Sequence, residues 1–83
     1  MTVVGYISEL PMWTIYRNPT DYPGKFVVRR SAVMQGGAIH TDSQPCFVGD
    51  SLSAARASLP HERGLVCMMR HPNDLPQIVE VWL

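Results

Sequence analysis

The stretch MWTIYRNPTDYPGKFVVRR, residues 12–30, predicts two β-strands joined by a turn. Residues 12–16 and 25–30 are rich in aromatic and β-branched side chains, and in both runs these alternate with other side chains at the period of two that is typical of strands. Pro19 and Pro23 lie between the runs and favour a turn, since proline fixes φ near the value that a turn needs. The stretch therefore predicts a hairpin with a long loop.

The chemistry of this turn recurs later in the chain. RNPTDYP (residues 17–23) and RHPNDLP (residues 70–76) share the pattern Arg-x-Pro-x-Asp-x-Pro. The second copy also lies between two strand-like runs, residues 65–69 and 77–83. We therefore expect a second hairpin of the same kind near the end of the sequence.

Each of the two loops carries an arginine and an aspartate four residues apart. We expect Arg17 to reach Asp21, and Arg70 to reach Asp74, across the mouth of the loop. Such exposed ion pairs contribute only ~0.2–1 kcal/mol. Two interpretations of the repeat stay open: a pair of equivalent binding loops, or the same turn chemistry used twice. The second is favoured because these turn residues are common.

The stretch DSLSAARASLP, residues 50–60, predicts a short helix. Asp50 or Ser51 supplies the oxygen that caps its first turn, the alanines favour the helical state, and Pro60 ends it. An apolar stripe is expected to face a sheet: Leu52, Ala55 and Leu59. The opposite side is expected to face water: Ser53, Arg56 and Ser58.

The least regular part of the chain is residues 31–44, where Val33-Met34 and Ala38-Ile39 flank two glycines and could form a further small hairpin. Together these elements predict an α+β domain in the order ββαββ. It would hold a mainly antiparallel sheet of about four strands, with one short helix on one face.

A chain of 83 residues supports one hydrophobic core. We expect residues 12–83 to form that single domain, and residues 1–11 to be an N-terminal extension or an extra strand. The run IVEVWL, residues 78–83, carries one charge and no proline, so at an edge of the sheet it would be an open template for pairing. Either residues 3–7 cover it, or a second copy does; we predict a weak homodimer over the self-covered monomer.

The composition of the chain indicates its compartment and excludes some classes of partner. Seven basic residues balance seven acidic ones, so no net charge attracts nucleic acid or anionic lipid. No basic start and no cleavage site mark a secretory signal, and no membrane association is predicted. Cys46 and Cys67 belong to no Cys-x-x-Cys unit, so we expect free thiols in a cytoplasmic protein.

Catalytic and metal-binding motifs are missing from the sequence. It has neither a phosphate-binding glycine loop nor a Gly-x-Ser-x-Gly elbow, so we predict that the protein is no enzyme and binds no cofactor. Cys67 lies in an apolar run and is expected to be buried as a small hydrophobe. No metal site is predicted, because the residues of metal-ligand type lack the close paired spacing of a zinc site. These residues are His40, Asp42, Cys46, His61, Cys67 and His71.

Protein binding is the function left after these exclusions. Five methionines, two tryptophans and three tyrosines are more adaptable and aromatic surface than a core of this size hides easily. The alternative is a nucleic-acid-binding protein that uses an arginine-rich and aromatic face of the hairpins, with Trp13, Tyr16 and Phe26 among the arginines. The predicted partner-binding residues are Arg17, Tyr22, Arg29, Arg30, Arg70 and Asp74.

The chain also resembles a group of short uncharacterised proteins of bacteria and their phages. The residues that carry the likeness are MWTIYR (12–17), FVVRR (26–30), the helix stretch and the final run, and Met12-Trp13 looks like the group's usual beginning. The resemblance implies no activity. By analogy, small phage proteins often bind and block a host complex, as anti-CRISPR inhibitors do, so the expected partner is a bacterial defence or regulatory assembly.

Overall fold

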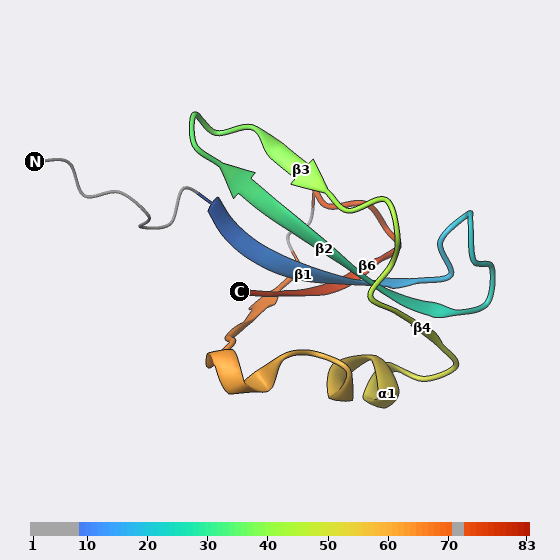
Figure 1. Ribbon diagram of the computed structural model, residues 1–83. Helices are drawn as coiled ribbons and strands as arrows, with labels where there is room; N and C mark the ends of the chain where they lie inside the picture. Colours follow the sequence, from blue (N-terminus) through green and yellow to red (C-terminus); the bar gives the residue numbers. More distant parts are fainter. Residues whose placement is uncertain (1–8, 71–72) are drawn as a thin grey trace, which may run out of the picture.

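The computed structural model describes residues 9–70 and 73–83, and shows an antiparallel sheet with one short helix (Figure 1). The α+β class is thus confirmed. The strands run in the spatial order β3-β2-β1-β6-β5, and β4 also pairs with β2. The elements are β1 (Glu9–Arg17), β2 (Phe26–Met34), β3 (Ile39–Thr41), β4 (Phe47–Gly49), α1 (Leu52–Ala57), the 3-10 turn η1 (His61–Arg63), β5 (Cys67–Met69) and β6 (Ile78–Trp82).

The hairpin predicted from residues 12–30 is confirmed, and its strands are longer than expected. β1 begins at Glu9, ahead of the pattern that starts at Met12, and β2 continues to Met34. The loop between them closes through Asn18, whose φ of 52° lies in the left-handed region that asparagine tolerates better than most residues. Asn18 Oδ1 accepts a hydrogen bond from the amide of Gly24 at 2.7 Å, which holds the loop closed.

Two short strands, β3 and β4, lie within and just after residues 31–44, the stretch with the least regular sequence. The glycine turn predicted there is present, since the amide of Gly37 donates to Met34 O and the amide of Met34 donates to Ala38 O. It leads into β3, and β4 then pairs with the first part of β2. Over the described residues the element order is therefore ββββαββ with six strands, instead of the predicted ββαββ with about four.

The prediction that residues 78–83 form an open edge is wrong. β6 lies inside the sheet, antiparallel to β1 on one side and to β5 on the other. A strand between two neighbours has no free ladder to offer, which removes the reason for a dimer through this strand. The run at residues 3–7, the other predicted cover, lies outside the described residues.

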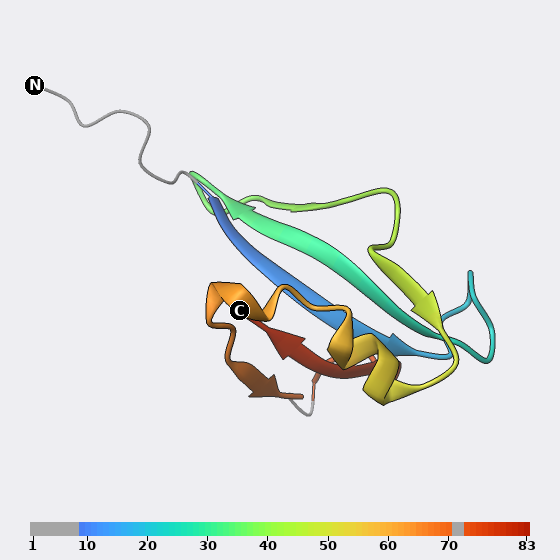
Figure 2. The ribbon, with the colours of Figure 1, turned by 60° about the horizontal axis from the view of Figure 1, so that its bottom comes forward.

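The helix forms where the sequence predicts it and packs on one face of the sheet (Figure 2). Ser51 caps α1 by accepting a hydrogen bond from the amide of Ala54 at 3.1 Å. α1 ends at Ala57, ahead of Pro60. The predicted inner stripe is confirmed: Ala55 and Leu59 are buried, and Leu52 packs against them. None of the described helices is long and apolar enough to cross a membrane.

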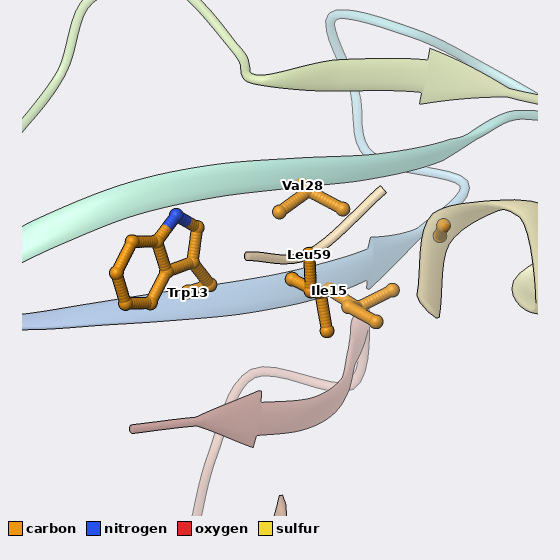
Figure 3. Close-up of a cluster of buried hydrophobic side chains, with 5 residues drawn as sticks. Trp13, Ile15, Val28 and Leu59 are labelled. Carbon is orange, nitrogen blue, oxygen red and sulfur yellow. The ribbon is translucent and has the colours of Figure 1, made fainter. Parts of the chain in front are cut away.

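The core lies between the sheet and the helix (Figure 3). Ile15 and Val28 lie opposite each other on β1 and β2, Leu59 packs over them, and Trp13 lies beside them along β1. Ile15 and Val28 have no exposed surface. A core of so few side chains stabilises the fold only modestly, because small domains bury a smaller fraction of their surface than large ones.

Gly49 on β4 has no room for a side chain, and we expect Gly49→Ala to destabilise the protein. A Cβ atom there would overlap the ring of Phe47, which packs against the core. Displacing the ring should lower the free energy of unfolding by about 1–3 kcal/mol. Urea unfolding measures the loss. In a Phe47→Leu background the same substitution should cost clearly less, and an equal cost would contradict the clash.

Candidate functional site: an apolar groove at the end of β1

An opening with apolar walls lies at the start of β1. The ladder between β1 and β6 reaches only as far as Trp13 and Trp82, whereas β2 continues beside β1 to Glu9. Residues 9–12 thus have a strand neighbour on one side only, among the residues that the structure describes. The space on their other side is a groove of about 340 Å³, lined by Leu10, Pro11, Met12, Trp13, Val33, Arg63, Leu65 and Leu83.

Pro11 closes the backbone edge that faces this groove. Leu83 and Val66 exchange two backbone hydrogen bonds, so the backbone groups of Leu83 point toward β5. Backbone groups alternate in direction along a strand, so those of Trp82, the residue before Leu83, point toward Trp13 of β1. Alternation along β1 then points the backbone of Pro11 to the same side as that of Trp13. Proline has no N–H to donate, so it fits at an uncovered edge and denies an incoming strand a hydrogen bond.

Two arginines hold the indole of Trp13 at the groove. The guanidinium carbon of Arg63 lies 5.5 Å from the ring centroid and that of Arg30 lies 6.0 Å from it. Both distances allow cation–π attraction. Arg30 also approaches Asp42, at 3.9 Å. Arg63 is the charged residue among those that line the groove, and among the described residues no carboxylate forms an ion pair with it.

Exposed apolar side chains continue from the groove across the sheet. Leu10 lies opposite Val33, and Val33 lies opposite Ile39, so the three share one face. Side chains alternate between the two faces of the sheet along β1, and Leu10 is three residues from Trp13, so the two side chains lie on opposite faces. Because Trp13 packs toward α1, Leu10, Val33 and Ile39 lie on the face away from the helix. Leu10 is 67% exposed and Ile39 66% exposed. We call the groove together with this row of three the apolar surface.

The two repeated loops meet at the opposite end of β1. Because β1 and β6 are antiparallel, the loop after β1 lies beside the loop before β6, and the amide of Arg17 donates to Gln77 O at 2.7 Å. A second, shallower pocket of about 430 Å³ opens between them, lined by Tyr16, Pro19, Thr20, Asp21, Leu75 and Gln77. The sequence indicates that the loops are alike, but it does not indicate that they are neighbours.

Of the two contacts expected within these loops, the one between Arg17 and Asp21 is replaced by another, and Arg70 reaches Asp74 at its backbone. Asp21 pairs with Arg29 of β2 instead of Arg17. Arg29 is only 18% exposed, so the pair fastens the first loop to the sheet. In the second loop Arg70 Nη2 donates to the backbone carbonyl oxygen of Asp74 at 3.1 Å.

The six predicted partner-binding residues fall in two places. Arg29 and Arg30 are adjacent on β2, so their side chains point to opposite faces of the sheet. Arg30 lies against Trp13 near the groove. The other five belong to the two loops or contact them: Arg17, Tyr22, Arg29, Arg70 and Asp74. Arg29 and Arg30 thus lie on opposite faces of the sheet, and the aromatic ring that Arg30 approaches is that of Trp13.

Glu80 of β6 is the centre of the polar contacts between the sheet and α1. It is 8% exposed and accepts hydrogen bonds from Arg56 Nε at 2.7 Å, Arg56 Nη2 at 3.0 Å and Trp82 Nε1 at 3.0 Å. The hydrogen bonds from Arg56 hold the pKa of Glu80 below its usual value. Arg56 is exposed, as predicted, and its guanidinium also joins the helix to the sheet through Glu80.

Cys67 lies beside this cluster on the edge strand β5, and its predicted burial is wrong. Both cysteines are free, as expected, and both are exposed. Partial desolvation and the Glu80 carboxylate raise the pKa of the Cys67 thiol. A raised pKa reduces the fraction of thiolate at neutral pH. The described residues contain no group of three side chains that could hold a metal ion.

Comparison with protein-family models, curated proteins and solved structures finds no match to this chain.

Proposed function

We propose that this protein is a non-enzymatic protein-binding module whose contact site is the apolar surface. The observation that carries the proposal is the gathering of exposed apolar side chains around the groove. Leu10 and Leu83, which line the groove, are 67% and 54% exposed, and Ile39 extends the surface across the sheet. Contiguous exposed apolar side chains on a small protein are typical of an interaction site.

Affinity capture with matched variants tests this function. Leu10→Ser combined with Leu83→Ser removes apolar area from the groove at two exposed positions, where folding tolerates the change. We expect a stoichiometric partner, captured from the native host by the unaltered protein, to be reduced about tenfold or more with this variant.

The matched control is Leu75→Ser, which is equally exposed at 62% but lies in the pocket between the loops. It should capture the partner as well as the unaltered protein does. If the groove variant and Leu75→Ser lose the captured partner equally, the apolar surface is not the specific contact site. If no stoichiometric partner is recovered and a broad activity screen finds turnover, the protein is an enzyme instead.

The mode of action that we propose is blocking of a bacterial defence or regulatory complex, on the analogy with small phage inhibitors. Expression in a CRISPR-active host should then change phage plating efficiency. Unchanged plating would remove this mode and leave binding itself in place.

The alternative, nucleic-acid binding, has a direct test in a gel shift with single-stranded and duplex probes at several salt concentrations. Phosphate contacts make affinity fall steeply with salt. Since Arg29 and Arg30 point to opposite faces, we expect no shift even at low salt.

A further inference from the structure

We propose that the groove takes a bulky apolar side chain from an acidic segment of the partner protein, with Arg63 pairing with the partner's carboxylate. The inference rests on the proposed protein-binding function and deepens it by naming the partner's chemistry. Three features of the groove carry it: its size, its charge and its closed backbone edge.

The size of the groove fits a side chain. At about 340 Å³ it lies at the lower end of the ~300–1,000 Å³ range of ligand pockets. Its walls are aliphatic and aromatic, from Leu10, Met12, Trp13, Leu65 and Leu83. Interface energy concentrates where one or two large side chains fill such a space and lose contact with water. An aromatic or leucine anchor meets both conditions.

The charge at the groove selects an acidic neighbour for that anchor. Arg63 is exposed and lies against the indole of Trp13, which presents its guanidinium at the edge of an apolar site. Among the described residues it has no carboxylate partner. A partner carboxylate next to an apolar anchor would complete this site, whereas a lysine there would be repelled.

Pro11 at the uncovered edge of β1 opposes binding of a peptide as an added strand. A peptide that adds as a strand needs a continuous series of backbone donors and acceptors. Pro11 lacks the donor at the uncovered position of β1, and Glu9 is the next residue that faces the same side. The groove therefore recognises side chains.

Peptide titration of the full-length, nitrogen-15-labelled protein by NMR tests the assignment. The probe is a capped hexapeptide with two glutamates on each side of a phenylalanine-leucine pair. One control peptide replaces the glutamates by lysines, and another replaces the apolar pair by serines. We expect shift changes at Leu10, Leu65, Leu83 and the Trp13 indole N–H, with the acidic apolar peptide alone, at concentrations up to about 1 mM.

Variants of two exposed arginines separate the role of Arg63 from a general charge effect. Arg63→Gln should weaken binding of the acidic peptide about fivefold or more, whereas Arg70→Gln, in the second loop, should leave it unchanged. Arg63→Glu should reverse the preference toward the lysine peptide, a reversal that a merely structural role for Arg63 would not produce.

Several results would overturn the proposal: equal binding of the lysine peptide, shift changes confined to the two loops, or no change at about 1 mM peptide. If deletion of residues 1–8 moves the groove signals without peptide, the groove belongs to the chain's own N-terminal segment, and the proposal is also overturned. These failures are distinguishable from failure of the proposed function. If the peptide fails but the groove variant still loses its captured partner, protein binding stands and only the partner's chemistry is wrong.

Discussion

Truncation of Ile15 to alanine is expected to lower the free energy of unfolding by about 2–5 kcal/mol. Ile15 has no exposed surface and lies on β1, between β2 and β6 and beneath Leu59. Strands on both sides prevent the backbone from closing the cavity, so the lost contacts are not replaced. In a small domain a loss of this size is a large part of the total stability. Urea unfolding followed by circular dichroism measures it.

A graded series checks that the effect comes from packing. Ile15→Val removes one methylene group and should cost about 0.5–1.5 kcal/mol. Val48→Ala on β4 removes apolar atoms at a side chain that is 39% exposed, and should cost less than Ile15→Ala. Equal losses for Ile15→Ala and Val48→Ala would show that the core does not lie where the structure places it.

Glu80→Gln is expected to lower the melting temperature by about 5–10 °C at pH 7. The amide keeps the size of the side chain but loses the charge that strengthens the hydrogen bonds from Arg56 and Trp82. It also turns an N–H₂ group toward donors, which leaves a nearly buried polar group without a partner. The screened, half-exposed position of Arg56 keeps the effect moderate.

The effect of Glu80→Gln must depend on pH in one direction. The pKa of Glu80 in the folded protein lies below the value in the unfolded chain, which is about 4.3. Its ionisation therefore stabilises the fold fully above that value, and the stabilisation is lost as pH falls through the lower, folded pKa. Melting curves of both proteins should differ at neutral pH and converge in acid. A difference that grows below about pH 4 would contradict this contribution of the Glu80 carboxylate.

Local patterns predicted the parts of the fold whose causes are local. Alternation in residues 12–16 indicated β1, Ser51 was one of the two residues predicted to cap α1, and the paired glycines indicated the turn before β3. The position of β6 could not be predicted in this way, because nothing in an apolar alternating run says which strands will lie beside it. Cys67 was misjudged for the same reason, since its run is apolar but its strand lies at an edge.

The candidate site was beyond sequence reasoning because its residues are distant along the chain. Leu10, Val33, Leu65 and Leu83 come from four separate segments, and only the antiparallel pairing brings them together. The arginine that we assign to partner binding, Arg63, was not among the predicted residues. Its one signal in the sequence is a cation beside an apolar run, which is too common to be informative.

The position of β6 between β1 and β5 also determines when a nascent chain can fold during synthesis on the ribosome. β1 is made first, yet β6, one of its two neighbours, is made only after the helix and the three short strands β3, β4 and β5. Until residues 78–82 emerge, Ile15 and Trp13 lack the flanking strand, and Arg56 of α1 has no Glu80 to bind. A six-residue helix cannot persist by itself. Synthesis that stalls late would therefore leave an apolar hairpin open to chaperones and proteases, and cooperative folding must wait for the final strand.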